Sequence, residues 1–345
     1  MKYDIFNFTR EQLKTILKEH GFKPYRGDIL YKWIYEKLIF DFYKMTDIAK
    51  TDREKLHSIF SIEKPSFEYK AVSKLDNTRK FAINFDNEWI ESVLIPSRSR
   101  LTQCLSTQTG CSLACKFCAT GKAAGQNLTV SQIIRQYLAV QSDSNARISN
   151  IVFMGMGEPF LNTDNVLNAI RILNDERGIK IGARRITVST AGIVPGIREF
   201  SQFDIQAKLA VSLNSAVQKK REYLMPIASK YPLDLLKQAL LDYQKENNRR
   251  ITFEYIIIPG FNDSRSDSDA LLKYLDDFDC KINLIPYNPV SGSSFREPSK
   301  REIDSFKSRM YPFKDSVSIR QSKGSDIEGA CGQLKNRLSD NIKGK

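Results

Sequence analysis

The chain has 345 residues, a formal net charge of +13, six cysteines and two histidines. This length suits one large domain with a smaller one. The N-terminus is charged, and no segment reaches the roughly 18 apolar residues of a membrane span, so a membrane protein is excluded and a cytoplasmic one is expected. The cysteine content fits a reducing compartment rather than a disulfide framework, and the positive charge makes a nucleic acid a candidate partner.

Residues 1–65 predict a small helical domain. Thr9 is placed to cap a helix that ends near Gly21, because a hydroxyl accepts from the first backbone amides and glycine suits a helix C-terminus. Apolar residues then recur at helical spacing from Ile29 to Leu38, and a third helix is expected from Asp52 to Phe60.

The rest of the chain reads as β and then α/β structure. Residues 66–98 alternate apolar and polar side chains around Asp86-Asn87, which predicts a connecting β-hairpin. Residues 99–335 alternate short apolar strands with helix-length segments, and six such units predict a partial (β/α)6 barrel, an α/β fold. Residues 336–345 are expected to form a basic C-terminal tail. The barrel strands are expected at Leu101–Thr107, Asn150–Met154, Arg185–Ser189, Lys208–Leu213, Ile251–Ile258 and Lys281–Pro286, with a further extended piece at Ser316–Arg320.

Three cysteines follow the first barrel strand in a C-x3-C-x2-C motif. Cys111, Cys115 and Cys118 supply one thiolate fewer than a closed zinc site needs. A [4Fe-4S] cluster held by three cysteines keeps one iron open for another ligand. This spacing, with Phe117 before the last cysteine, is the signature of enzymes in which S-adenosylmethionine (SAM) binds the open iron, the radical SAM enzymes. The alternatives are a zinc knuckle that borrows Cys104 and a set of unrelated buried thiols.

Polar residues and glycines stand where other barrel strands end, and in parallel barrels the chemistry lies at those ends. Each of them has an alternative role as a simple strand-end cap. The candidate SAM-binding residues are Gly157, Glu158, Ser189, Ser212, Leu213, Asn214 and Asn288.

The other cysteines divide into two kinds. Cys331 lies in a loop of small residues that leaves its thiol accessible, and Cys104 lies on the first barrel strand. Cys280 precedes an apolar strand and is expected to be a buried structural thiol.

Several segments together resemble the RlmN/Cfr family of radical SAM RNA methyltransferases. They are LSTQTGCSLACKFCATG, NIVFMGMGEPFLN, RRITVSTAGIVPGI, LMPIASKYPL, KINLIPYNPVSG and DIEGACGQL, with KPYRGDILYKWIYEK and MTDI in the helical N-terminal part. The resemblance is to the RlmN branch, which methylates C2 of an adenosine in 23S rRNA and in tRNA, more than to the Cfr branch, which methylates C8. Two departures are Asn214, where the family usually has His, and Ser268-Asp269-Ala270, where it has a His-Ala pair.

The resemblance implies a mechanism that uses two SAM molecules per turnover. One methylates the thiolate of Cys331, and the second, bound to the cluster, is cleaved to a 5′-deoxyadenosyl radical that takes a hydrogen from the new methyl group. The carbon radical adds to C2, a base removes the C2 proton, and Cys104 attacks the sulfur of Cys331 to release the product and leave a disulfide. Glu91 matches the family's proton acceptor, although its strand pattern by itself predicts a solvent-facing carboxylate.

The same resemblance implies that residues 1–65 recognise RNA, that the partners are 23S rRNA, tRNA and an electron donor such as flavodoxin or ferredoxin, and that the protein is a monomer. Two other readings compete. One is a radical SAM enzyme acting on a peptide or small molecule, against which Cys104, Cys331 and the helical N-terminal domain argue. The other is a non-catalytic RNA-binding protein with a structural metal, as the positive charge and three cysteines would suggest.

Overall fold

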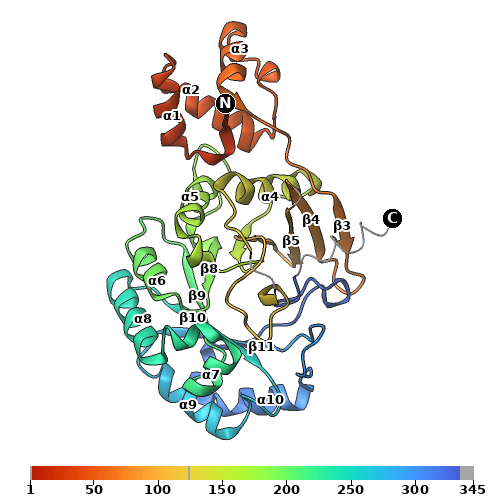
Figure 1. Cartoon of the computed structure of the whole chain (residues 1–345), viewed down its shortest axis with the longest axis vertical. Coiled ribbons are helices and arrows are strands. Elements are labelled where there is room, and N and C mark those ends of the chain that lie inside the picture. Colours follow the sequence, from red (N-terminus) through yellow and green to blue (C-terminus); the bar gives the residue numbers. More distant parts are fainter. Residues whose placement is uncertain (1, 87, 123–124, 335–345) are drawn as a thin grey trace.

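The computed structural model describes residues 2–86, 88–122 and 125–334. A small helical unit formed by the N-terminal residues stands at one end of a larger α/β unit (Figure 1). The expected basic tail, residues 336–345, and Asn87 of the expected hairpin turn lie outside the described residues.

The N-terminal unit contains the three expected helices. Thr9 caps α1 (Arg10–Glu19) through reciprocal hydrogen bonds with Gln12, and Gly21, with a φ of 75°, follows the end of that helix. The second helix differs from expectation, since α2 (Arg26–Tyr31) widens into a π-helical turn at Lys32–Glu36. The remaining elements are 3-10 turns at Ile5–Asn7 and Phe42–Lys44, α3 (Lys50–Ile59), and the parallel pair β1 (Tyr3–Asp4) and β2 (Phe60–Ser61).

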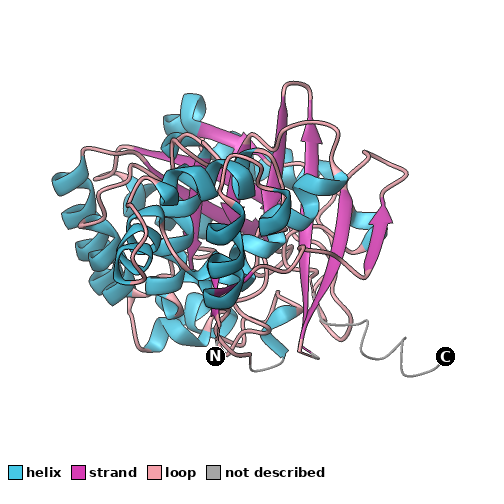
Figure 2. Cartoon of the chain, turned by 90° about the horizontal axis from the view of Figure 1, so that it is seen from above, coloured by secondary structure: helices cyan, strands magenta, loops and turns pink. Residues whose placement is uncertain are grey.

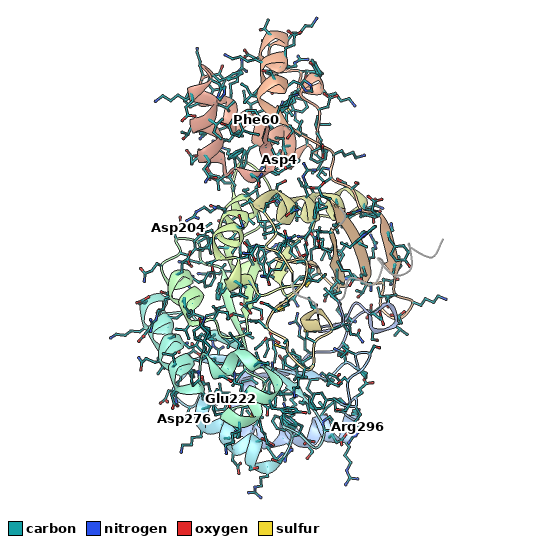
Figure 3. The ribbon with its side chains drawn as sticks, viewed as in Figure 1. Asp4, Phe60, Asp204, Glu222, Asp276 and Arg296 are labelled. Atoms are coloured by element: carbon teal, nitrogen blue, oxygen red, sulfur yellow. The ribbon has the colours of Figure 1, made fainter. Side chains whose placement is uncertain are left out.

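Polar contacts join this unit to the larger one. Asp4, at the edge of the unit in Figure 3, accepts a hydrogen bond of 2.6 Å from Ser131 and lies 3.2 Å from Arg135, both on α4 (Val130–Asp143). Arg10 lies 2.8 Å from Asp175, next to the end of α5 (Thr163–Asn174). The helical unit is therefore held against one end of the larger unit by half-buried ion pairs.

A ten-stranded sheet forms the centre of the larger unit, with its strands in sequential order from β3 to β12. Strands β6 to β12 are parallel, which confirms the expected α/β barrel pattern, and β12 adds a seventh strand to it. The strands are β3 (Tyr69–Val72), β4 (Arg79–Phe85), β5 (Glu88–Ser97), β6 (Arg100–Cys104), β7 (Asn150–Phe153), β8 (Ile186–Thr190), β9 (Lys208–Ser212), β10 (Ile251–Ile257), β11 (Cys280–Pro286) and β12 (Val317–Ile319).

The hairpin of β4 and β5 continues this sheet. Strand β5 pairs antiparallel with β4 on one side and with β6 on the other, where Val93 faces Cys104. The pairing with β6 covers residues 93–97 of β5, and nearer its start the carbonyl of Glu91 accepts instead from the hydroxyl of Ser106 at 2.6 Å. The hairpin thereby brings its side chains beside the first strand of the barrel.

Helices pack on the outer face of the parallel strands, and the antiparallel strands continue the sheet past the helices (Figure 2). On β10, Phe253 packs against Phe278 and Tyr255 stacks on Phe306, with ring centroids 5.2 Å apart in each pair. Since side chains alternate along a strand, Glu254 and Ile256 point to the inside of the barrel. The other helices are α6 (Val194–Ser201), α7 (Gln218–Leu224), α8 (Leu233–Asn247), α9 (Arg265–Leu275) and α10 (Lys300–Arg309), with 3-10 turns at Thr120–Lys122, Pro159–Leu161, Ala183–Arg185, Pro226–Ser229, Tyr311–Ser316 and Ser325–Ile327.

The segment after β12 bridges the two edges of the open sheet. Gly324 donates through its backbone amide to Asp76 at 3.0 Å, and Lys74 donates through its amide to Asp326 at 2.9 Å. Asp76 and Lys74 belong to the turn between β3 and β4, so the C-terminal loop crosses from one edge of the sheet to the other. In the part of the chain that the structure describes, no helix is both long and apolar enough to span a membrane.

Candidate active site

A pocket opens at the C-terminal ends of the parallel strands, and five of the six cysteines line it. They are Cys104, Cys111, Cys115, Cys118 and Cys331. The sixth, Cys280, is buried in the core, as the sequence predicts. Residues separated by more than 200 positions therefore meet in one cavity, because parallel strands deliver the loops that follow them to the same edge.

The loop that carries the three motif cysteines is closely supported. Ala114 has a φ of 53°, a left-handed conformation that is rare for residues with a side chain. Lys116 donates through its amide to the carbonyl of Leu224 at 2.9 Å, and Ala119 donates to that of Gly332 at 2.7 Å. The cysteine loop is thus held by α7 on one side and by the loop of Cys331 on the other.

The three motif cysteines lie half-buried together in the pocket wall. Burial raises the pKa of Cys111 to about 11 and that of Cys115 well above its usual range, and the charges of neighbouring cysteines add to both shifts. A metal cluster binds cysteines as thiolates, so its binding here would release the protons of these thiols. All three cysteines line the same pocket, as the ligands of one cluster must.

Gly157 and Glu158 follow β7 and lie in the pocket wall. Gly157 has a φ of 98°, and a Cβ atom there would come within 2.6 Å of the side chain of Gln108, so the position requires glycine. Glu158 is buried and accepts from the amides of Phe160 at 3.1 Å and Ala191 at 2.7 Å, and burial raises its pKa to about 7. Thr190 also donates to this carboxylate through its side chain, so three of the four lone pairs have donors and one is left for a ligand.

The other candidate SAM contacts are placed differently from one another. Ser189, Ser212, Asn214 and Asn288 line the pocket, whereas Leu213 is fully buried outside its wall. Asn214 has a φ of 57°, and its side-chain oxygen accepts from the amide of Ile256 at 3.0 Å. Asn214, where the related family usually has His, therefore joins the end of β9 to β10.

Hydrogen bonds from the residues after β11 hold the loop of Cys331 in place. Asn288 donates to the carbonyl of Cys331 at 3.2 Å and accepts from Ser322 at 2.6 Å. The thiol of Cys331 is accessible, as the sequence predicts, and Cys104 is buried. The desolvating surroundings raise the pKa of Cys104 to about 12 and that of Cys331 to about 11, so both are protonated at neutral pH in the absence of a base.

Glu91 is buried, with 4% of its surface exposed, so the solvent-facing position that its strand pattern predicts is wrong. The reason is that the segments after β6 and β7 lie against β5 at this point, where Ser106 and Met156 contact the backbone of Glu91. Glu91 does not belong to the pocket wall, but side-chain alternation puts it on the same face of β5 as Val93 and Ile95, which do. Its carboxylate lies 3.1 Å from the ammonium of Lys80.

Three charged residues at this site were not predicted from the sequence. Glu254 and Arg320 line the pocket, and Lys80 contacts Glu91. The inward position of Glu254 can be read from the alternation along its strand, in which Phe253 and Tyr255 are the large apolar neighbours. The position of Arg320 follows from the pairing of β12 with β11, which the sequence pattern does not reveal.

Family comparisons agree with this geometry. Residues 3–62 match the model of the ribosomal RNA large subunit methyltransferase N-terminal domain, and residues 105–272 match that of the radical SAM superfamily. These two regions coincide with the helical unit and with most of the parallel barrel.

Individual relatives match over nearly the whole chain. A probable dual-specificity RNA methyltransferase RlmN of Petrotoga mobilis is 42% identical over 97% of this chain and 97% of its own length. The dual-specificity RNA methyltransferase RlmN of Geobacter sulfurreducens is 42% identical over 97% of this chain and 92% of its own. The crystal structure of a radical SAM methyltransferase from Sphaerobacter thermophilus superposes with a TM-score of 0.91 at 36% identity, covering 96% of this chain and 99% of that one. The chain belongs to the RlmN family of radical SAM methyltransferases.

Proposed function

We propose that this protein methylates C2 of one adenosine in 23S rRNA and of one adenosine in tRNA. Its relatives in Petrotoga mobilis and Geobacter sulfurreducens carry the name dual-specificity RNA methyltransferase. The observation that carries the proposal is that Cys104 and Cys331 line the same pocket as the three motif cysteines. A radical SAM enzyme that only cleaved SAM would not need this second pair of thiols.

The target atom explains why such a pocket is required. Adenine C2 is electron-poor and does not attack a methyl sulfonium directly, so a radical route replaces ordinary methyl transfer. The radical SAM family uses a [4Fe-4S] cluster and SAM, which supply the radical that activates the methyl group. Cys111, Cys115 and Cys118 would hold the cluster, and Gly157, Glu158, Ser189, Ser212, Asn214 and Asn288, with the backbone at Leu213, would hold SAM.

The remaining residues handle the methyl group and the protons. The thiolate of Cys331 accepts the methyl group and presents it to C2 of the adenine. Glu91 accepts the proton of C2, supported by its burial and by the neighbouring ammonium of Lys80. Cys104 then attacks the sulfur of Cys331, which releases the methylated adenosine and leaves a Cys104–Cys331 disulfide.

The proposal assigns residues 1–65 to RNA recognition, residues 66–98 to the hairpin that carries Glu91, and residues 99–335 to the catalytic barrel. Tyr25 and Tyr43 of the helical unit are each 49% exposed, and exposed aromatic rings are platforms on which RNA bases stack. An external donor such as flavodoxin or ferredoxin supplies the electrons, and the protein acts as a monomer in the cytoplasm.

Mass spectrometry of RNA tests the proposal. Nucleosides from 23S rRNA and tRNA are compared between a host strain that lacks C2-methyladenosine and the same strain expressing this chain. We expect C2-methyladenosine in both RNA fractions. Methylation at C8 instead would assign the chain a Cfr-like activity, and no methylation of either RNA would reject an RNA substrate.

A further inference from the structure

A buried carboxylate on β10 has one oxygen that the fold does not use. Glu254 is 4% exposed and points into the barrel, where it lines the pocket. Its Oε1 atom accepts from Asn283 at 2.9 Å and lies 3.5 Å from the guanidinium of Arg320. Its Oε2 atom is fully buried and finds no hydrogen-bond partner among the described residues.

Such an oxygen is costly in a folded protein. A buried polar group without a partner loses its hydration and gains no hydrogen bond in return, and the loss is larger for a charged group. The hydrogen bonds on the Oε1 side continue through Asn283, whose side-chain oxygen accepts from Ser318 at 2.6 Å. Glu254 also lines the pocket that Cys331 lines, so this unpartnered oxygen belongs to a residue of the pocket wall.

Few other groups in the pocket wall could play the same part. Glu158 is the other carboxylate in the wall, and both of its oxygens accept backbone hydrogen bonds. The charged and titratable side chains of the wall are Glu158, Glu254, Arg320 and Lys323, with the cysteines at 104, 111, 115, 118 and 331. Glu254 is thus the wall carboxylate with an unengaged oxygen, and it shares the pocket with the thiol that must be deprotonated.

We propose that Glu254 is the proton acceptor that activates Cys331 for its own methylation, directly or through one water molecule. The proton of the Cys331 thiol moves to Oε2 of Glu254. The sulfur electron pair forms the new bond to the methyl carbon of SAM, and the electrons of the broken carbon–sulfur bond leave with S-adenosylhomocysteine. The step needs neither an oxidant nor a reductant, and it rests on the proposed function, in which Cys331 carries the methyl group.

Electrostatics of the pocket agree with this assignment. Desolvation by the surrounding pocket wall raises the pKa of Cys331 to about 11, opposed by Arg320 and reinforced by the charge of Glu254. At pH 7 roughly one thiol in ten thousand would be ionised at that pKa, so a base nearby has a large effect. Burial also raises the pKa of Glu254, against the opposing effects of Arg320 and Asn283, and a carboxylate with a raised pKa is a stronger base.

The test follows methylation of Cys331 in the absence of RNA. Anaerobic holoenzyme is mixed with SAM, and the mass of the peptide that contains Cys331 is followed in a single turnover across pH. Removal of a general base slows proton transfer by about 100-fold or more. We expect that loss in Glu254→Gln near pH 7, with a rate that keeps rising with pH where the wild-type rate levels off. Glu254→Asp keeps a carboxylate and should recover part of the rate.

Two controls isolate the proton transfer. Glu246→Gln makes the same chemical change at an exposed residue of α8, outside the pocket wall, and should methylate Cys331 at the wild-type rate. Calorimetric titration with SAM should give Glu254→Gln an unchanged affinity. A wild-type methylation rate in Glu254→Gln would overturn the inference, as would a loss of SAM affinity that accounts for the slower rate. Wild-type enzyme that never gains a methyl group on Cys331 would instead overturn the proposed function itself.

Discussion

The ammonium of Lys80 lies 3.1 Å from the carboxylate of Glu91 and also donates a hydrogen bond of 3.4 Å to the carbonyl of Glu328. Lys80 is on β4, Glu91 is on the neighbouring β5, and Glu328 precedes Cys331 in the C-terminal loop. One lysine of the hairpin therefore joins the proposed acceptor of the C2 proton to the loop of the proposed methyl carrier.

This contact predicts a double effect of Lys80→Met. The buried carboxylate of Glu91 would lose its cation, which costs about 3 kcal/mol in the free energy of unfolding, and RNA methylation should fall strongly because the carboxylate and the loop are no longer held together. Lys80→Arg should retain most of the stability and most of the methylation activity. Chemical denaturation and methylation assays measure the two effects, and unchanged stability with unchanged turnover in Lys80→Met would contradict the coupling.

The cluster should require each motif cysteine. In Cys115→Ala one iron loses its protein ligand, so iron content and formation of 5′-deoxyadenosine from SAM should both be lost. Cys280→Ala, which removes a buried thiol outside the pocket, is the matched control and should retain both. Iron analysis and chromatography of the SAM products decide the result, and a Cys115→Ala protein with full iron and normal cleavage would reject the cluster assignment.

Substitutions of Cys104 and Cys331 should block the reaction at different steps. Cys331→Ala removes the methyl carrier, so neither S-methylcysteine nor a protein–RNA adduct should form, although the cluster stays intact. Cys104→Ala keeps the carrier but cannot resolve it, so a covalent adduct should accumulate, migrate slowly on a denaturing gel and disappear with RNase. Normal release of methylated adenosine by Cys104→Ala would show that Cys104 is a structural cysteine.

RNA binding should depend on salt and on the helical unit. Replacing three exposed lysines of that unit by glutamine should weaken RNA binding and lower the slope of log affinity against log salt by up to about 2, because fewer counterions are released. SAM cleavage without RNA should not change. The same exchange on the outer helices of the barrel is the control, and equal effects of the two sets would reject a recognition role for residues 1–65. The test set is Lys23, Lys44 and Lys50, and the control set is Lys245, Lys273 and Lys300.

Low pH should weaken the contact between Asp76 and the C-terminal loop and so lower the stability of the fold. Burial acts to raise the pKa of Asp76, but hydrogen bonds from Thr78, Gly324 and Ser73 outweigh it and lower the pKa below its usual value. A lowered folded-state pKa gives stability that is fully present above the unfolded value, about 3.9, and is lost as the pH falls through the folded value. The difference in unfolding free energy between wild type and Asp76→Asn should therefore be constant above about pH 5 and shrink at lower pH. A difference that grows in acid would contradict this.

Much of the fold could be predicted from the sequence because its signals are local. Alternation and helical spacing located each parallel strand to within a few residues, and Thr9 with Gly21 bounded the first helix. The cysteine motif predicted the metal chemistry for the same reason, since its three thiols come from eight consecutive residues and need no other part of the chain.

The tertiary structure decided which distant residues meet. The hairpin pattern did not show that β5 pairs with β6, which brings Ser106 and Met156 against Glu91 and so buries it beside the pocket. Pairing of β12 with β11 likewise brings Arg320 to Glu254, and the loop that follows β12 crosses to the turn at Asp76. Periodicity reports which face of a strand is apolar. It carries no information about which strand lies next to it, because long-range pairing depends on how the whole chain packs.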